Sequence, residues 1–255
     1  VPELLGPSQV RAPRLLAVLE HERLLVLEDF HEGVSLDRWL PEATVSEAHT
    51  VGRRIGRAIG SLHRNGSHAR IRASFNNTKT QKTRWDTQYA NIGEWLAHLE
   101  LQFAGAVGRE AAQLGERWNS LGETLVMGDL WPRSVLVAPS STETVLIDWE
   151  LAHFGRPEQD TAHFLAHLWL HSETGPATEN WKASARGFED GYASVRGDEQ
   201  LRSHSFRVHF LSECTARLLG PFSRGTAFDS FSPEQARALL EKAYEHTHST
   251  RGSRQ

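Results

Sequence analysis

Apolar and polar positions follow different periods along the chain, and these periods predict the secondary structure. Residues 14–28 contain two short apolar runs separated by a polar turn at residues 21–23, which indicates a pair of strands. From residue 47 to residue 63 the apolar positions recur every three or four residues, which predicts an amphipathic helix. Three glycines recur every four residues within it and would permit close packing against another helix: Gly52, Gly56 and Gly60.

The middle of the chain has a weaker pattern. Residues 64–84 are polar, and we predict that they are irregular. A helical region is predicted from about residue 87 to residue 121, with a break near Gly105 or Gly108.

Short apolar segments after this region predict a small group of strands. Residues 124–127, 135–137 and 145–147 are each apolar, and the last two are separated by a turn, which indicates a hairpin. A turn-rich polar loop separates the first strand from this hairpin. The rest of the chain shows only helical periods, which cover four segments: residues 161–171, 180–195, 201–219 and 233–248. Ser232 and Gln235 predict a capping box at the start of the last one.

Composition narrows the class of protein. The 255 residues include 39% apolar and 24% charged residues with a net charge of −4, which is typical of a globular protein. A basic excess would be expected of a general nucleic-acid-binding protein, so we expect no nucleic-acid partner. The single cysteine, Cys214, rules out a disulfide framework within the chain. No apolar run approaches the roughly 18 residues needed to span a bilayer. We therefore expect a cytoplasmic protein with no membrane partner, while the oligomeric state does not follow from the sequence.

We expect the first strand to neighbour the hairpin, so that three acidic residues gather at the ends of neighbouring short strands. Asp129 follows the first strand, and Asp148 and Glu150 follow the third. If the third strand continues through them, Asp148 and Glu150 point to the same side, because side chains alternate along a strand. Carboxylates in such a group repel one another unless a cation lies among them, and hard oxygen ligands favour Mg²⁺ held together with phosphates. Acidic residues in an ordinary turn are the alternative interpretation.

The spacing of these residues is typical of kinases. In kinase catalytic loops a base Asp precedes a metal-binding Asn by five residues, and a second metal-binding Asp follows later. Here Asp129 precedes Ser134 by five residues, and Asp148 follows after a strand and a turn.

These motifs resemble those of the aminoglycoside phosphotransferase and choline kinase superfamily. The matching segments are GDLWPRSVLV at 128–137, IDWELA at 147–152, GRP at 155–157 and DTA at 160–162. Ser134 and the Asp-x-Glu pair are more similar to methylthioribose kinases. Some short segments resemble those of uncharacterised fungal members. Residues 24–30, LLVLEDF, resemble the strand and hinge that contact adenine. The resemblance extends from about residue 13 to residue 192.

The resemblance implies a fold and an activity. The fold would be α+β and protein-kinase-like, with a mainly helical C-terminal lobe, a catalytic β-hairpin and a truncated N-terminal lobe. Residues 1–30 would be the remnant of the N-terminal lobe with the hinge, and residues 31–255 the catalytic and substrate lobe. The activity would be ATP- and Mg²⁺-dependent transfer of a phosphoryl group to a hydroxyl of a small molecule.

The resemblance also implies roles for individual residues. Asp129 would be the catalytic base. The expected metal site comprises Asp148, Glu150 and Ser134, with Ser134 also able to hold a phosphate. Backbone groups of three residues would line the adenine site: Glu28, Asp29 and Phe30. Asp160 is expected to have a structural role, tying the catalytic loop to the helix that follows.

Two departures from the family pattern keep a second interpretation open. Met127 stands where the family has His, and only 14 residues, none of them Lys, precede Leu15. A glycine-rich loop and a strand Lys therefore have no counterpart in these residues, so either the protein continues upstream of Val1 or it is a shortened relative. A non-catalytic, kinase-fold binding or regulatory protein is the alternative, although Lys79 or Lys82 could replace the strand Lys.

Three histidines recur every four residues on one predicted helix face: His163, His167 and His171. We interpret them as packed or exposed side chains, with metal binding as the alternative.

Overall fold

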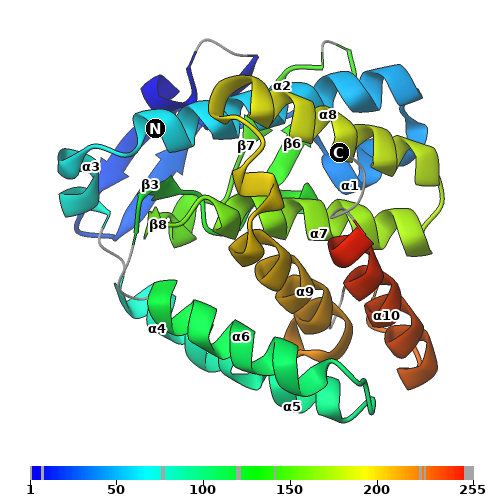
Figure 1. Cartoon of the computed structure of the whole chain (residues 1–255). Helices are drawn as coiled ribbons and strands as arrows, with labels where there is room; N and C mark the ends of the chain where they lie inside the picture. Colours follow the sequence, from blue (N-terminus) through cyan, green and yellow to red (C-terminus); the bar gives the residue numbers. More distant parts are fainter. Residues whose placement is uncertain are drawn as a thin grey trace.

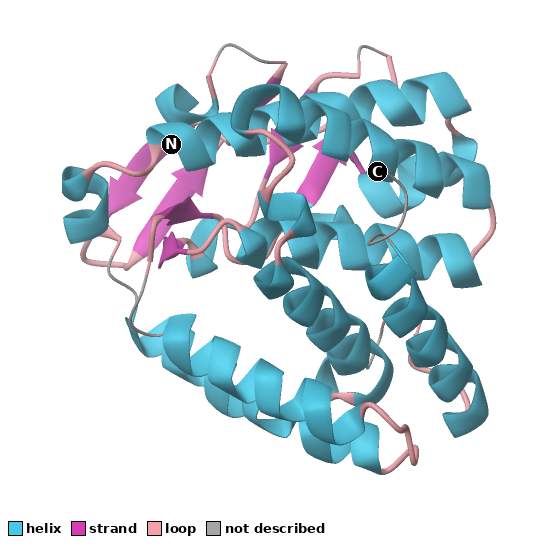
Figure 2. Ribbon diagram, viewed as in Figure 1, coloured by secondary structure: helices cyan, strands magenta, loops and turns pink. Residues whose placement is uncertain are grey.

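The computed structural model describes residues 2–6, 9–75, 78–118, 122–140, 142–223, 226 and 228–249. Helices make up most of the chain, and the strands lie together in the upper half of Figure 2. Within the described residues, no helix is both long and apolar enough to cross a membrane.

A four-stranded sheet contains the predicted hairpin. Its order is β1 (Val10–Arg11), β7 (Thr144–Leu146), β6 (Val135–Val137) and β4 (Val34–Ser35). The pairing of β6 with β7 is antiparallel, so the predicted hairpin is confirmed. The strand β1 runs parallel to β7, and β4 runs antiparallel to β6. The sequence did not reveal β1 and β4 because a strand of two residues has no measurable period.

The strand before the loop that carries Asp129 belongs to a different sheet. We expected residues 124–127 to neighbour the hairpin, but β5 (Thr124–Val126) pairs with β8 (His153–Gly155). The expectation failed because the true partner of β5 is β8, which has only three residues and is too short to be recognised from its pattern. The loop that carries Asp129 is therefore held between two sheets.

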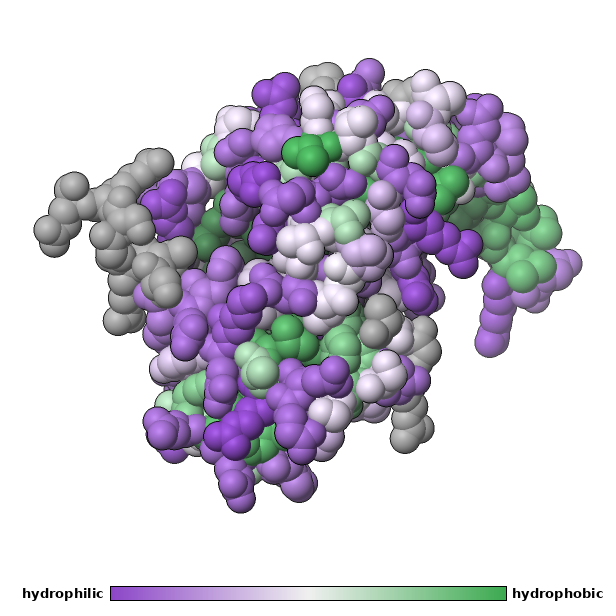
Figure 3. All heavy atoms as spheres, turned by 90° about the vertical axis from the view of Figure 1, so that its right-hand side faces the viewer, coloured by the Kyte–Doolittle hydropathy of each residue, from purple (hydrophilic) through white to green (hydrophobic). Residues whose placement is uncertain are grey.

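The first two predicted strands form an exposed ribbon. The strands β2 (Leu15–Leu19) and β3 (Leu24–Leu27) pair only with each other among the described strands, in antiparallel orientation. Their leucines and valines are 40% to 66% exposed, so neither face of the ribbon is covered. An apolar area projects from the surface at the right-hand edge of Figure 3. A two-stranded ribbon has little stability of its own, so this one depends on what supports it.

Besides short 3-10 helices, ten α-helices are found in the described residues (Figure 1). Their bounds are α1 (Leu36–Trp39), α2 (Val45–Asn65), α3 (Ala69–Ser74), α4 (Thr78–Thr87), α5 (Ile92–Ala97), α6 (Ala104–Trp118), α7 (Glu158–Thr174), α8 (Thr178–Arg196), α9 (His204–Leu219) and α10 (Pro233–Ser249). Capping boxes begin α2, at Thr44 and Glu47, and α10, at the predicted Ser232 and Gln235.

For the middle of the chain one expectation was wrong, and the predicted helix break was found just before the first of its two expected positions, Gly105. Residues 64–84 contain α3 and most of α4 instead of irregular chain. The pattern missed α4 because its one buried side chain is Gln81, so it has no apolar stripe. The break in the following helical region falls at residues 98–103, and Gly108 lies inside α6. There it serves close packing, since a Cβ on Gly108 would lie 2.3 Å from the Cα of Gly93 in α5.

The predicted close packing through glycines is confirmed between α2 and α8, which lie side by side. A Cβ on Gly52 would lie 2.1 Å from the carbonyl oxygen of Ser184, and one on Gly56 equally close to that of Phe188. The contact is reciprocal, because a Cβ on Gly191 would lie 2.1 Å from the Arg53 carbonyl oxygen. Backbone therefore touches backbone along this pair of helices.

Replacing Gly56 by Ala is expected to destabilise the protein by about 1–3 kcal/mol, because the added methyl group overlaps the backbone of α8. Gly105→Ala is the matched control. Gly105 is exposed in the first turn of α6, and a Cβ there meets the flexible Arg109 guanidinium at 3.5 Å. Its effect is expected to stay within about 0.5 kcal/mol. Urea denaturation measures both variants, and equal effects would contradict the close-packing explanation.

Candidate active site

The loop after β5 is anchored by the buried carboxylate of Asp160. Its two oxygens accept hydrogen bonds from the backbone amides of Met127 and Gly128, each at 2.8 Å. His63 Nε2 lies 3.0 Å from Oδ2 of the same carboxylate. Burial alone raises the pKa of Asp160, but the hydrogen bond and charge of His63 and the two amides outweigh it and hold the pKa below its ordinary value. Asp160 thus ties the loop to α7, as expected.

Gly128 shapes the turn that leads to Asp129. Its φ of 85° lies in the left-handed region, and a Cβ would lie 2.3 Å from the carbonyl oxygen of Leu151. Arg84 of α4 donates a hydrogen bond to the Gly128 carbonyl. The amide and the carbonyl of the residue before Asp129 are therefore both held by hydrogen bonds.

Asp129 lies at the end of a buried chain of polar groups. Its side chain is 28% exposed, and Oδ1 lies 3.5 Å from Nε2 of His163, which is fully buried. The other ring nitrogen of His163 lies 2.7 Å from Oε1 of Glu213, in α9. Burial alone raises the pKa of Glu213, but the charge and hydrogen bond of His163, with the charge of Arg217, bring it well below its ordinary value.

Sequence reasoning missed this contact. It treated His163 as packing and did not single out Glu213. One signal was present: His163 lies three residues after Asp160, so both side chains lie on the same face of α7. The contact of Glu213, in α9, with His163 is visible only in the tertiary structure.

His163, His167 and Glu213 could in principle bind a metal, because their ligand atoms lie within 4.8 Å of one another. Arg84 and Arg217 approach Glu213 at 3.7 Å and 3.6 Å. These two guanidinium groups already supply the positive charge that a metal would bring, and a dication among them would be repelled. The charge of Glu213 is therefore balanced without an ion.

The metal-site prediction requires one correction. The strand that precedes Asp148 does not continue through it, because β7 ends at Leu146 and Trp149–Leu151 form a 3-10 turn. Asp148 has φ 72°, a left-handed conformation that Asp adopts more readily than most residues. Strand alternation therefore does not relate Asp148 to Glu150. Both carboxylates are nevertheless exposed, and as hard oxygen donors they fit a Mg²⁺ ion.

Ser134 is used inside the loop. It is 1% exposed, and its hydroxyl accepts a hydrogen bond from the Trp131 amide at 3.0 Å. The same hydroxyl lies 3.1 Å from the Asp129 carbonyl oxygen and 2.9 Å from that of Trp131, and it can donate to either. These contacts give Ser134 a role in shaping the loop, and they do not support the predicted contact with metal or phosphate.

The predicted adenine-binding segment adjoins the hairpin. Arg11, on β1, forms ion pairs with Glu28 and with Glu143 in the turn after β6. The amide of Glu28 donates to the Arg14 carbonyl at 2.9 Å, and the carbonyl of Phe30 accepts from Gly33 at 2.8 Å. Two backbone groups of this segment are therefore already hydrogen-bonded, while the Asp29 side chain is exposed.

A cavity of about 490 Å³ opens beside Asp129. Its walls come mainly from α4 and include the side chains of Lys79, Thr83 and Arg84, with Arg217 from α9. Neither the segment 28–30 nor Asp148, Glu150 or Ser134 is among the described residues that line it. Asp129 therefore belongs to the wall of a cavity large enough for a small molecule.

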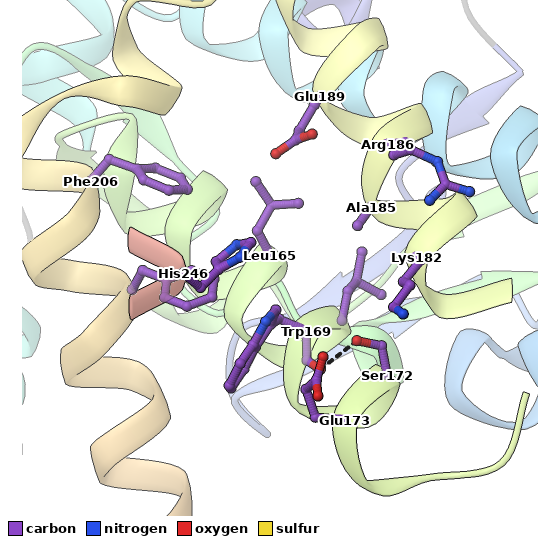
Figure 4. Close-up of a pocket in the computed structure, with 12 residues that line it drawn as sticks. Leu165, Trp169, Ser172, Glu173, Lys182, Ala185, Arg186, Glu189, Phe206 and His246 are labelled. Carbon is purple, nitrogen blue, oxygen red and sulfur yellow. Dashed lines mark hydrogen bonds between the residues drawn. The ribbon is translucent and has the colours of Figure 1, made fainter. Parts of the chain in front are cut away.

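A second cavity, of about 270 Å³, lies among α7, α8, α9 and α10 (Figure 4). Leu165 and Trp169 of α7 line it, and they lie on the face of that helix opposite to His163 and His167. None of the predicted site residues is among its described lining residues.

Comparison with known proteins decides the family. Residues 3–197 match the phosphotransferase enzyme family, APH. The chain belongs to this family. The predicted superfamily is confirmed, and a single match covers the loop, the hairpin and Asp160.

Individual relatives agree with this assignment. A 4-hydroxytryptamine kinase from Psilocybe cyanescens is 29% identical over 182 residues, which are 66% of this chain and 50% of that protein. The chain thus spans about half the length of this curated relative.

Several solved structures share the fold. A glucosamine kinase has a TM-score of 0.57 at 15% identity, with 95% of this chain and 67% of that chain covered. A putative aminoglycoside phosphotransferase from Ralstonia eutropha has a TM-score of 0.55 at 17% identity, with 97% and 81% covered. An ethanolamine kinase from Plasmodium vivax has a TM-score of 0.52 at 15% identity, with 93% and 70% covered. The predicted α+β, protein-kinase-like fold is confirmed.

Proposed function

We propose that this chain transfers the γ-phosphoryl group of ATP to a hydroxyl group of a small molecule. One observation carries the proposal: Asp129 lines a cavity of small-molecule size while its loop is anchored from behind by Asp160. Membership of the phosphotransferase family supports the reaction type. The relative named for 4-hydroxytryptamine, a compound with a hydroxyl group, supports a small-molecule acceptor.

In the proposed reaction Asp129 orients the acceptor hydroxyl and receives its proton. The hydroxyl oxygen forms a bond to the γ-phosphorus as the bond from that phosphorus to the bridging oxygen breaks, and the electron pair leaves with ADP. His163 and Glu213 hold the Asp129 carboxylate from behind through the contacts described above. Phosphoryl transfer needs mainly positioning and charge neutralisation. The anchored loop supplies the positioning.

The nucleotide side of the site is proposed from the exposed acids and the hinge. Asp148, assisted by Glu150, would hold Mg²⁺, which neutralises phosphate charge when bound. Backbone groups of residues 28–30 would contact adenine. Residues 1–30 would then serve the nucleotide, and residues 31–255 the catalytic loop and the acceptor.

Binding of Mg²⁺-ATP by calorimetry tests the proposal. Asp148→Ala is expected to weaken binding at least about tenfold, because it removes a charged ligand of the metal. Asp198→Ala is the control, since Asp198 is an exposed acid that pairs with Arg202 and belongs to no proposed site. Its affinity should equal that of the unsubstituted chain.

Two results would count against the proposal. Equal affinity of the Asp148→Ala and Asp198→Ala variants would show that Asp148 does not hold the metal. No binding by the unsubstituted chain would favour a non-catalytic kinase-fold protein instead.

A further inference from the structure

One side of the helix α4 is polar and borders the cavity beside Asp129. Gln81 is the buried side chain of this helix. Lys79, Thr83 and Thr87 recur every four residues, as do Thr80, Arg84 and Gln88, and all six line the cavity beside Asp129. Residues four apart lie on the same side of a helix. Trp85 and Gln81 form the packing side of α4, and the side with these six polar residues borders an open space, as a helix that binds a polar ligand requires.

The charges around this cavity are unequal. Lys79, Arg84 and Arg217 line it, and Asp129 is the one carboxylate among its described lining residues. Glu213 lies behind the wall, fully buried, within 3.7 Å of Arg84 and 3.6 Å of Arg217. Counting Glu213, three cations face two carboxylates, and Asp160, whose charge also reaches Arg84, is already paired with His63. The cavity thus retains a positive excess, which attracts an anion and repels an ammonium group.

The two arginines are held in place before any ligand arrives. Arg84 is 12% exposed and donates to the Gly128 carbonyl. Arg217 is 13% exposed, and its guanidinium lies 5.8 Å from the centre of the Trp131 ring. A guanidinium group presents a planar set of donors that matches a carboxylate or a phosphate, and little freedom remains to be lost on binding. Lys79, in contrast, is exposed and can move toward a ligand.

The cavity also has a defined place relative to the proposed nucleotide site. Asp148, Glu150 and residues 28–30 are not among the described residues that line it, whereas Asp129 is. If Asp129 acts between the two substrates, this cavity is on the acceptor side.

We propose that the acceptor is an anionic hydroxyl compound, a hydroxy acid or a sugar acid or phosphate, whose charged group is bound by Lys79, Arg84 and Arg217 while its hydroxyl faces Asp129. This inference rests on the proposed phosphotransferase function, since that function makes the cavity an acceptor site. It excludes amines as good acceptors for this chain.

Four hexoses that differ in one group test the charge preference: glucuronate, glucose 6-phosphate, glucosamine and glucose. Binding of each to the full chain is measured by calorimetry without nucleotide, with inorganic phosphate and oxalate as minimal anions. Glucuronate or glucose 6-phosphate is expected to bind at least about tenfold more tightly than glucose, and glucosamine more weakly than glucose. The two anions also distinguish a carboxylate from a phosphate as the preferred group.

Variants test whether a preference for anions arises in this cavity. The double variant Lys79→Gln with Arg217→Gln is expected to lose the preference for anions. Lys82→Gln is the matched control, because Lys82 is an exposed lysine on the same helix that pairs with Asp86 and does not line the cavity. Circular dichroism shows whether each variant folds, and Lys79→Gln alone replaces the double variant if that one does not.

The outcomes separate this inference from the proposed function. Glucosamine or glucose binding as tightly as both anionic hexoses overturns the inference, and so does the absence of binding by every anion. The inference is also overturned if the preference for anions is as strong in the double variant, or in Lys79→Gln where that replaces it, as in Lys82→Gln. ADP release from Mg²⁺-ATP is then measured with each hexose. Anion-selective binding without any ADP release would leave the charge preference standing and would count against the phosphotransferase function.

Discussion

Replacing Asp129 by Asn is expected to lower the rate of phosphoryl transfer by about 100- to 10,000-fold, the usual loss when a positioned acid or base is removed. Asn has nearly the same shape, so the loop should keep its conformation, but the amide cannot accept the hydroxyl proton. The rate is measured as ADP release with saturating Mg²⁺-ATP and the best acceptor among the four hexoses. The affinity for Mg²⁺-ATP is measured separately by calorimetry.

The proposed role of Asp129 requires these two measurements to diverge. The turnover should fall while the affinity for Mg²⁺-ATP stays within about threefold, because Asp129 is assigned to the acceptor hydroxyl and not to the metal. Asp198→Asn serves as the control for the substitution itself, since that exposed carboxylate pairs with Arg202 at the surface. Turnover by Asp129→Asn at the rate of this control would refute the assignment of the base.

Replacing Asp160 by Asn is expected to destabilise the protein by about 3–5 kcal/mol, the usual cost of removing one partner of a buried charged pair. The carboxylate accepts hydrogen bonds from two backbone amides and contacts His63, all out of contact with solvent. An amide has a single acceptor oxygen, so it cannot accept from both backbone donors, and its NH2 group would face one of them. Thermal denaturation followed by circular dichroism should show a melting temperature lower by roughly 10 °C at pH 7.

The pH dependence of this effect follows from the pKa of Asp160. That pKa is lower in the folded state, so the carboxylate stabilises the fold fully above the unfolded-state value of about 4 and loses its effect as pH falls through the folded-state value. The difference in melting temperature between the two proteins should therefore shrink below about pH 4.

A surface pair of the same chemistry provides the control for Asp160. His49 and Asp190 lie 3.2 Å apart, and their side chains are 39% and 67% exposed. Asp190→Asn should change the free energy of unfolding by less than about 1 kcal/mol, as is typical of exposed ion pairs. Similar effects of the two substitutions would mean that the buried carboxylate does not anchor the loop.

Local patterns in the sequence were sufficient for features that neighbouring residues determine. The hairpin of β6 and β7 followed from two apolar runs and a turn, and the capping box of α10 from residues three apart. The contact between α2 and α8 followed from glycines spaced at one helical turn, because such spacing leaves a flat helix face whatever the partner is. The order of the family's motifs was enough to single out Asp129, Asp148 and Asp160.

The same reasoning failed where polar contacts, not apolar periods, decide the structure. The helix α4 was missed because its face toward Asp129 carries Lys, Thr and Arg, so no apolar period exists to detect. The alternation of Asp148 and Glu150 depended on the strand continuing through them, yet the chain turns there through a left-handed residue, which hydrophobic patterning cannot reveal.

By itself, the sequence of this protein indicated the family, the hairpin that follows the loop at residues 128–134, and the candidate acids Asp129, Asp148 and Asp160. Only the tertiary structure decided which groups surround those acids. Glu213 reaches His163 from α9, and Arg84 reaches Gly128 from α4, although each pair is far apart in the chain. The physical reason is that a motif records local backbone geometry, whereas the charge of a cavity depends on side chains that folding brings together from separate helices.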